Sequence, residues 1–408
     1  MRVPAILSFV ALALPVVVSG QAKPRARDLG VPFDGTPGPL NAITDVAGVT
    51  VGQVTIVSGK GKLVVGQGPV RTGVTAVLPR GAANGDPVMA GWFTLNGNGE
   101  MTGTTWLEES GFLAGPVMIT NTHSVGVVRD AVIEWLVHKG FNFDWSLPVV
   151  AETWDGSLND INGFHVTKQD AFRALDSARS GPVAEGNVGG GTGMICHQFK
   201  GGIGTASRRF TIEEKTYTLG VLVQCNYGVR RLLRIAGVPV GAEIADLLPC
   251  LDVAGPLPNA DERYPRCPAG VGTRDPGPGG IGEMGSIIVV VATDVPLLPH
   301  QLQRVARHVS LGIGKMGGLG SNSSGDIYVA FSTANPNAAD TKGLHSATFI
   351  PNEAITTVFE ATVQATEESI TNALVAAETM TGANDLRVTA LPRDRLRAAL
   401  QKYGRLGK

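Results

Sequence analysis

The sequence predicts a layered α/β fold, in which helices pack on β-sheets. Three observations lead to this prediction. β-rich runs and helical stretches are mixed along the chain, and they alternate without the regular βαβ rhythm of a doubly wound sheet. With 408 residues, of which 43% are hydrophobic and 17% are charged, the chain can also bury a large core.

The predicted elements of the first half are mostly strands. β-branched and apolar runs predict strands near residues 49–57, 74–78, 117–120, 149–152 and 217–225. Helical periodicity predicts one helix over residues 124–139.

The C-terminal third contains two further strands, three helices and the end of a linker. Strands are predicted at 287–292 and 327–332, with an amphipathic helix at 298–310 that keeps Arg304, Arg307 and His308 outside. A long helix is predicted over 352–380, capped by Asn352 after Pro351, and a short helix over 393–403. Residues 256–285 are rich in proline and glycine and are expected to form a linker.

The N-terminus has the pattern of a secretory signal. Arg2 precedes an apolar stretch over residues 5–18, and Val18-Ser19-Gly20 offers small residues for cleavage before Gln21. The alternative is a membrane anchor, for which the stretch is short. We therefore expect residues 1–20 to be removed and the protein to be exported, either to a periplasm or as a secreted protein.

The cysteines and charges limit the classes of site. Cys250 and Cys267 flank a proline-rich loop and are the expected disulfide, whereas Cys196 and Cys225 lie in apolar runs and are expected to be buried free thiols. There is no CxxC or HExxH motif, so neither a metal nor another cofactor is expected. A net charge of −1 without a basic stripe argues against nucleic acid as a partner.

The junction Gly285–Ser286 joins the glycine-rich linker to the strand-like run 287–292. A serine at this place could become a new N-terminus if the preceding peptide bond were cut. Its hydroxyl would then be the nucleophile and its α-amine, with a pKa near ~7.7–8.0, the base. Locally, the alternative is that Ser286 only opens a strand.

Five polar, glycine-rich strings accompany this junction, and together they resemble one family. They are residues 96–103 (NGNGEMTG), 152–156 (ETWDG), 186–194 (GNVGGGTGM), 224–228 (QCNYG) and 321–326 (SNSSGD). The chain resembles the DmpA-type L-aminopeptidases/D-esterases and β-peptidyl aminopeptidases, which are self-processing N-terminal-nucleophile serine hydrolases. The likeness runs from about Arg27 to about Asp385, nearly the whole mature chain.

The resemblance implies an αββα sandwich of the DmpA and ornithine acetyltransferase type. It also implies a precursor that cuts itself between Gly285 and Ser286 into a large chain, 21–285, and a small chain, 286–408. Both chains would form one catalytic domain, and such heterodimers would assemble into oligomers.

The resemblance also assigns catalytic roles. Ser286 matches the nucleophile, and Asn226 matches the amide that helps to form the oxyanion hole. Ser324 and Asp326 match a serine–acid pair that holds the amine of the nucleophile. Asp326 stands where the family has the longer Glu, which weakens its match; its alternative is a turn acid.

Three further matches concern the substrate. Glu152 matches an acid that binds the free ammonium of the substrate, with a structural cap or turn salt bridge as the alternative. Trp154 stands where the two family branches have Tyr or Leu, so the resemblance does not decide which N-terminal side chain of the substrate is preferred. Gly190 and Gly191, within the 189–193 run, would offer backbone N–H groups near the substrate.

The predicted function is that of an exported serine aminopeptidase acting on short peptides, amides or esters with a free amine. One alternative is an acetyl-transferring enzyme of the ornithine acetyltransferase type, against which the serine nucleophile and the signal argue. Another is an exported scaffold without catalytic activity, which would remain a single chain.

Overall fold

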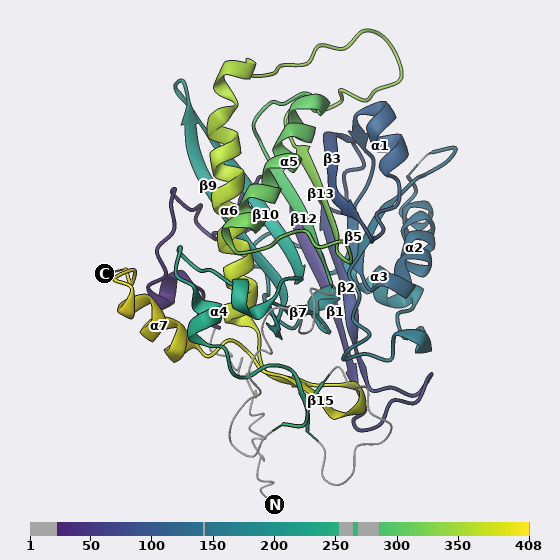
Figure 1. The fold of residues 1–408 in the computed structure, drawn as a ribbon. Helices are drawn as coiled ribbons and strands as arrows, with labels where there is room; N and C mark the ends of the chain where they lie inside the picture. Colours follow the sequence, from purple (N-terminus) through teal and green to yellow (C-terminus); the bar gives the residue numbers. More distant parts are fainter. Residues whose placement is uncertain (1–22, 142, 253–263, 268–284, 408) are drawn as a thin grey trace, which may run out of the picture.

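Two β-sheets lie face to face between two pairs of helices in the computed structural model (Figure 1). The structure describes residues 23–141, 143–252, 264–267 and 285–407. The predicted signal at 1–20 and most of the predicted linker at 256–285 lie outside these ranges. Within them, no helix is both long and apolar enough for a membrane crossing.

The larger sheet has six strands and holds the Gly285–Ser286 junction. Its order across the sheet is β4 (Phe112–Leu113), β3 (Val88–Gly97), β13 (Gly325–Ser332), β12 (Ser286–Thr293), β10 (Lys215–Asn226) and β9 (Gly202–Ile212). Only β12 and β13 run parallel in it. The first residues of β12 and β13 therefore lie beside the last residues of β10 and β3, at the same end of the sheet.

The smaller sheet has four strands. Its order is β1 (Thr50–Ser58), β2 (Val70–Leu78), β5 (Val117–Thr120) and β6 (Val149–Glu152). Short strands pair elsewhere: β7 (Ile195–Cys196) with β8 (Phe199–Lys200), and β15 (Leu386–Val388) with both β11 (Cys250–Leu251) and β14 (Met380–Thr381).

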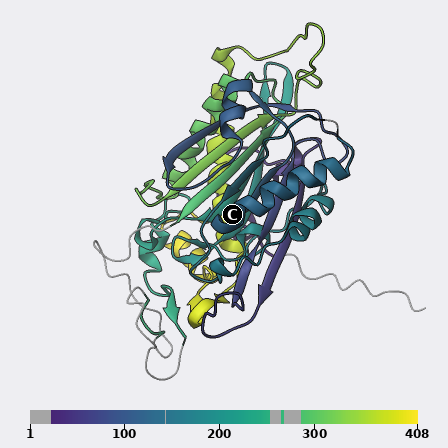
Figure 2. The same cartoon turned by 90° about the vertical axis from the view of Figure 1, so that its right-hand side faces the viewer.

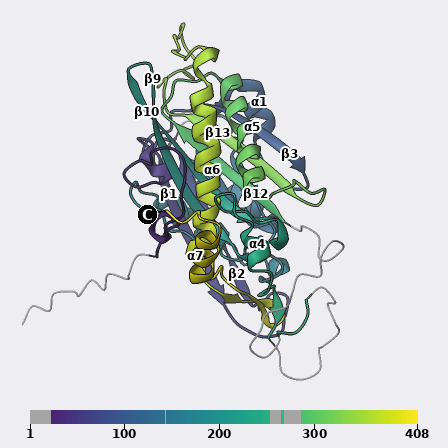
Figure 3. The ribbon, with the colours of Figure 1, turned by 60° about the vertical axis from the view of Figure 1, so that its left-hand side comes forward.

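Helices cover the outer face of each sheet. α5 (Pro299–Lys315) and α6 (Thr356–Ala376) cover the six-stranded sheet, and Figure 3 shows α6 crossing in front of its strands. α2 (Val125–His138) and α3 (Lys168–Asp176) cover the other sheet and lie in front of it in Figure 2. The remaining α-helices of the described residues are α1 (Thr104–Ser110), α4 (Val240–Glu243) and α7 (Arg393–Lys402).

Side-chain alternation along the strands builds three core layers. In β12, Ile287, Val289 and Val291 face α5 and α6, whereas Ile288, Val290 and Ala292 face the other sheet. Successive residues of a strand point to opposite faces, so a strand buried on both sides is a continuous apolar run. The predicted layered α/β fold and the αββα arrangement are both confirmed.

β3 and β9 were not predicted, because glycines interrupt their β-patterns. A Cβ on Gly91 of β3 would lie 2.3 Å from the backbone N of Gln303 in α5. A Cβ on Gly204 of β9 would lie 2.0 Å from the carbonyl O of Ser369 in α6. Both glycines let a helix approach the sheet closely, which a propensity-based prediction penalises.

The prediction for the long helix needs correction at both ends. Residues 352–354 form a separate 3-10 turn, and Asn352 is not a cap, because its Oδ1 accepts hydrogen bonds from Gln301 and Arg304 of α5. The helix itself ends at Ala376, and Met380 belongs to β14. Of the three α5 residues predicted to lie outside, only Arg307 is exposed, whereas Arg304 and His308 are half-buried. The His308 ring stacks on Phe359 with 3.7 Å between centroids, and the Arg304 guanidinium lies over the same ring.

The structure pairs all four cysteines. Cys250 and Cys267 form the expected disulfide, with 4.9 Å between their Cα atoms. The prediction of free thiols at Cys196 and Cys225 is wrong, because these two residues also form a disulfide, with 5.5 Å between Cα atoms. Their 29-residue separation gave no hint of pairing, which arises because β7 docks on the end of β10.

Candidate active site

A cavity of about 570 Å³ opens where the strand ends meet. Residues from both sheets and from the junction line it: Gly97, Asn98, Gly99, Glu100, Thr122, Glu152, Trp154, Gly285, Ser286 and Ser323. Ser286, Glu152 and Trp154 are thus brought together from two segments that the sequence analysis singled out, the 285–286 junction and the string 152–156. A cavity of this size suits a small ligand or the end of a peptide.

Ser286 is the first residue of β12 and is 5% exposed. Its Oγ accepts a hydrogen bond from the backbone N–H of Gly325, at 3.1 Å. This contact follows from the parallel pairing of β12 with β13, whose first residue is Gly325. The hydroxyl is therefore held at the cavity wall by a rigid part of the sheet.

Gly285 fits a place that no other residue can occupy. Its φ is +151°, and a Cβ there would lie 1.9 Å from the carbonyl O of Asn226 and 3.3 Å from its Nδ2. Under 3.0 Å, such an approach to backbone cannot be relieved without moving the chain. The glycine before the serine is thus demanded by its close approach to the end of β10.

The side-chain amide of Asn226 is held by two backbone groups. Oδ1 accepts from the backbone N–H of Ile195 at 2.7 Å, and Nδ2 donates to the carbonyl O of Trp154 at 2.9 Å. Because Asn226 is paired directly with Ser286 across β10 and β12, its amide lies beside the junction. One of the two hydrogens on Nδ2 remains for another acceptor.

Ser324 and Asp326 are fully buried on either side of Gly325. The Ser324 hydroxyl donates to Asp326 Oδ1 at 2.6 Å, and the backbone N–H of Asp326 donates to Asn96 Oδ1 at 2.8 Å. Asp326 is also opposite Ile287 in the parallel pairing, next to the backbone of Ser286. The structure thus brings the serine–acid pair to the junction.

Glu152 ends β6 and is 3% exposed. Its Oε1 accepts from the backbone N–H of Glu100 at 2.9 Å, and its Oε2 accepts from the Thr122 hydroxyl. Burial raises the pKa of the Glu152 carboxyl, although both hydrogen bonds oppose that shift. Neither hydrogen bond comes from a cation, and neither is a helix cap, so the carboxylate is available to a cationic ligand.

Trp154 lines the cavity, and its indole lies over Gly156, where a Cβ would be 2.6 Å from Cζ2. The neighbouring Asp155 is buried, and burial raises the pKa of its carboxyl to about 6. Asp155 also accepts a hydrogen bond from Asn159 Nδ2 at 3.0 Å. The buried Asp155 and its hydrogen bond to Asn159 therefore fix the turn after β6, and this turn holds Trp154 at the cavity wall.

Gly190 and Gly191 do not line the cavity. Both are buried in a 3-10 turn packed between the sheets. A Cβ on Gly190 would lie 2.2 Å from Gln224 Oε1, and one on Gly191 would lie 2.5 Å from the backbone N of Ile203. These glycines permit tight packing beneath the site, and the backbone N–H of Gly190 donates to Thr75.

Sequence reasoning assigned no role to several groups that complete the site. These are the backbone N–H groups of Gly325 and Ile195, the hydroxyl of Thr122, and the segment 97–100. The strings NGNGEMTG and SNSSGD contain the segment 97–100 and Gly325, whereas Ile195 and Thr122 lie outside all five strings, and backbone donors leave no side-chain signature. Among the described residues, no group of three or more His, Cys, Asp or Glu could hold a metal ion.

Comparison with known proteins identifies close relatives. The sequence profile of Peptidase family S58 matches residues 41–388. The chain is 57% identical, over 98% of both chains, to the beta-peptidyl aminopeptidase BapA of Sphingosinicella microcystinivorans. It is also similar to the L-aminopeptidase D-Ala-esterase/amidase of Ochrobactrum anthropi, whose structure superposes with a TM-score of 0.83 at 46% identity and covers 94% of this chain and 100% of that one. A Burkholderia sp. beta-aminopeptidase superposes with a TM-score of 0.79 at 44% identity, covering 93% and 99%.

Proposed function

Because the chain belongs to Peptidase family S58 and is a serine aminopeptidase, we propose that it is an exported enzyme that activates itself by cutting Gly285–Ser286. We further propose that Ser286 then releases N-terminal residues, including β-amino acids, from short peptides, amides and esters. The N-terminal signal pattern supports export, and the resemblance supports assembly of the processed heterodimers into an oligomer.

One observation carries the proposal. The hydroxyl of Ser286 and the carboxylate of Glu152 line the same cavity, and the amide of Asn226 lies beside the Gly285–Ser286 bond. A nucleophile, a donor for an oxyanion and an anion for an ammonium are the three groups that an aminopeptidase needs in one place.

Self-processing would begin with attack of Ser286 Oγ on the carbonyl carbon of Gly285. The C–N bond breaks as the C–O bond forms, and the hydroxyl proton passes to the leaving nitrogen, which leaves an ester on Oγ and a free α-amine on Ser286. Water then hydrolyses the ester to the carboxylate of Gly285. Gly285 supports this step, because an unhindered carbonyl beside the amide of Asn226 can be attacked at close range.

Turnover would use the α-amine released in that step. Ser286 Oγ attacks the acyl carbon of the substrate while the α-amine takes the hydroxyl proton, and that proton then leaves with the departing amine. Asn226 Nδ2 donates to the oxyanion, which is worth about 2.7–4 kcal/mol of barrier at comparable sites. Ser324 and Asp326 orient the α-amine, and water hydrolyses the acyl-enzyme.

Substrate choice would rest on Glu152 and Trp154. The ammonium of the substrate pairs with Glu152, which Thr122 and the backbone of Glu100 hold in place. The indole of Trp154 occupies more of the cavity than a phenol or an isobutyl group, so it would favour small N-terminal residues. The relation to a beta-peptidyl aminopeptidase adds β-alanine to glycine and alanine as expected residues.

A kinetic panel tests this function. Processed enzyme is assayed with the p-nitroanilides of β-alanine, alanine, glycine and phenylalanine, each with a free or an N-acetylated amine. We expect the small residues to be cleaved fastest and the N-acetylated forms to be poor substrates. Efficient cleavage of N-acetyl-β-alanyl p-nitroanilide would show that the enzyme is not an aminopeptidase.

A further inference from the structure

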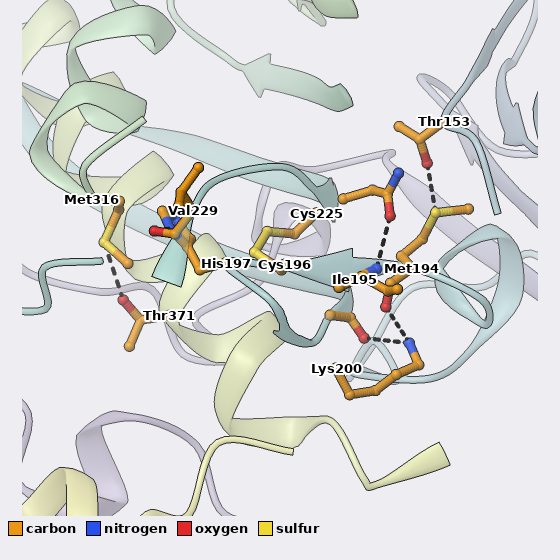
Figure 4. The surroundings of a disulfide bond; sticks show 12 residues. Thr153, Met194, Ile195, Cys196, His197, Lys200, Cys225, Val229, Met316 and Thr371 are labelled. Atoms are coloured by element: carbon orange, nitrogen blue, oxygen red, sulfur yellow. Dashed lines mark hydrogen bonds between the residues drawn. A yellow bond between two sulfur atoms is a disulfide. The ribbon is translucent and has the colours of Figure 1, made fainter. Parts of the chain in front are cut away.

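A single peptide unit connects a buried lysine to the amide of Asn226. The carbonyl O of Met194 accepts a hydrogen bond from Lys200 Nζ at 2.6 Å, and the N–H of the same peptide, on Ile195, donates to Asn226 Oδ1 at 2.7 Å (Figure 4). The order is therefore ammonium, peptide C=O, peptide N–H, amide C=O, amide N–H. Donation to a peptide oxygen strengthens the N–H of that peptide as a donor.

The polarity of this chain fixes the orientation of the Asn226 amide. The N–H of Ile195 can only donate and the carbonyl of Trp154 can only accept. Rotating the amide by 180° would place two donors against each other and two acceptors against each other. Asn226 Nδ2 therefore faces the junction only while Ile195 keeps its place.

Lys200 is an unusual residue to find in that position. It is fully buried, and the hydrogen bonds of its Nζ among the described residues go to backbone carbonyls, those of Met194, Gly201 and, at 3.5 Å, Gly191. Burial lowers the pKa of Lys200 to about 7. No carboxylate in the described part of the chain forms an ion pair with this ammonium, and the nearby charge of Asp155 offsets only part of the effect of burial. A buried ammonium of this kind opposes folding, so packing alone does not account for it.

A disulfide lies directly beside Ile195 and Asn226, the two residues that this hydrogen-bond chain connects. Cys196 follows Ile195, and Cys225 precedes Asn226. Both cysteines are fully buried, and their bond, drawn in Figure 4, links β7 to the end of β10. The second disulfide, Cys250–Cys267, adjoins neither Ile195 nor Asn226, so it serves as a matched control.

We propose that Lys200 is a positioning residue for the reaction, which acts through the Met194–Ile195 peptide to orient and polarise the Asn226 amide as an oxyanion donor, and that the Cys196–Cys225 disulfide keeps that peptide in place. This inference rests on the proposed function, because it requires Asn226 to be the donor. It assigns a role to a buried charge that lies outside the cavity.

A double-mutant cycle tests the proposal. Lys200→Met, Asn226→Ala and the double variant are compared by kcat and KM on β-alanyl p-nitroanilide, with the processed fraction measured by intact mass. We expect Lys200→Met to lower kcat about tenfold with KM within about twofold, against about 10²–10³-fold for Asn226→Ala. In the Asn226→Ala background, Lys200→Met should change kcat by less than about twofold.

The possible outcomes distinguish a failure of the role of Lys200 from a failure of the proposed function. An equal loss on Lys200→Met in both backgrounds, an unchanged kcat, or a raised KM alone overturns the role of Lys200. A fully active Asn226→Ala overturns the oxyanion assignment instead. If Asn226→Ala is not cut, it has no turnover to compare, and the double-mutant cycle cannot be completed. The kcat and KM of Lys200→Met alone then decide whether Lys200 has the proposed role.

A second route applies if Lys200→Met does not fold. Lys200→Gln keeps a donor without the charge, and Cys196→Ala/Cys225→Ala releases the peptide. Either should lower kcat without raising KM, whereas Cys250→Ala/Cys267→Ala should not change kcat. Equal losses in the two disulfide variants overturn the proposal, as does the detection of free thiols at Cys196 and Cys225 in the native protein.

Discussion

Glu152 and Trp154 are two residues apart at the end of β6, so both side chains face the cavity. Thr153 between them faces the other way, where its hydroxyl donates to the Met194 sulfur and accepts from Gln224 Nε2. The strand-like alternation thus continues just past the end of β6, and it separates the two residues that line the cavity from Thr153, which anchors the segment.

Glu152→Gln keeps the shape of the side chain and removes its charge. We expect kcat/KM for free-amine substrates to fall by about 10- to 100-fold, because a hydrogen bond to a charged group contributes about 1.5–3 kcal/mol. Parallel kinetics on an ester of the same acyl group without the amine provide the control. An equal loss on both substrates would make Glu152 a structural residue.

The same variant predicts a difference in pH dependence. Burial raises the pKa of Glu152, so its carboxylate takes up a proton at a higher pH than an ordinary glutamate. Binding of an ammonium is lost as the pH falls through that raised pKa. The acid limb of kcat/KM for free-amine substrates should therefore flatten in Glu152→Gln, and an identical limb in both enzymes contradicts the assignment.

Gly99 lies between Glu152 and Gly325, the residue whose backbone N–H donates to Ser286 Oγ. A Cβ on Gly99 would lie 3.3 Å from Glu152 Oε1 and 3.1 Å from Gly325 Cα, whereas a Cβ on Gly97 would meet nothing within 4 Å. Gly99→Ala should therefore obstruct ammonium binding and raise KM for free-amine substrates about tenfold or more, since small steric changes in a pocket cost about 1–3 kcal/mol. Gly97→Ala, in the same cavity wall, should match the wild type; equal effects of both alanines would contradict this.

At the scale of elements, the prediction of strands succeeded where the chain is uniformly apolar. Ile287 to Ala292 form an unbroken β-branched and apolar run, and β12 is central in its sheet. β3 and β9 were missed because close helix packing requires glycines in them. Local propensity cannot anticipate a neighbour that only the tertiary fold supplies.

The candidate site likewise contains residues that the sequence predicted and residues that it did not. Ser286, Asn226, Glu152 and Trp154 were singled out from their strings, and the structure brings all four to one place. Gly190 and Gly191 were expected at the substrate and instead pack between the sheets, because glycine marks any close backbone approach and not only that of a ligand. The Cys196–Cys225 pairing depends on how a two-residue strand docks, and no spacing rule encodes that.

The turn into β12 makes a prediction of its own. Gly285→Ala would place a Cβ 1.9 Å from the carbonyl O of Asn226. The junction must then move away from Asn226, and self-cleavage should slow by about 10²-fold or more, as expected when a reacting group is displaced by about 1 Å. The fraction of uncut chain over time, measured on denaturing gels, checks this; a normal rate of cutting would mean that the amide of Asn226 is not needed near the bond.

At the scale of the whole molecule, the segments before and after Gly285 are interleaved. β12 and β13 lie between β3 and β10 of the six-stranded sheet, and α6 is buried along most of its length. A cut at the junction would therefore leave two chains that share one core. Each chain supplies strands to the same sheet, which accounts for their expected association after processing.

A buried ion network ties these segments together. Glu368 of α6 pairs with Arg27 and Arg208, each at 2.8 Å, and Arg208 is 1% exposed. Burial would raise the pKa of Glu368, but the two guanidinium groups hold it below its ordinary value. Arg27 and Arg208 precede the junction and Glu368 follows it, so the network joins the two predicted chains.

Glu368→Gln should destabilise the fold by about 3–5 kcal/mol, because it leaves Arg208 buried without its charge partner. Urea unfolding at neutral pH measures the loss. The depressed pKa gives stability that is present above the unfolded pKa of about 4.3 and is lost as the pH falls through the folded value. The difference between wild type and variant should therefore narrow in acid, and a constant difference would contradict the network's charge.

The central claim is that Ser286 becomes an N-terminal nucleophile by cutting its own chain. The intact mass of the freshly purified protein, together with N-terminal sequencing, tests this most directly. We predict two chains, the smaller beginning Ser-Ile-Ile-Val, and a single inactive chain for Ser286→Ala. A wild-type protein that is active as one uncut chain, or a Ser286→Ala protein that is cut and active, would contradict the claim.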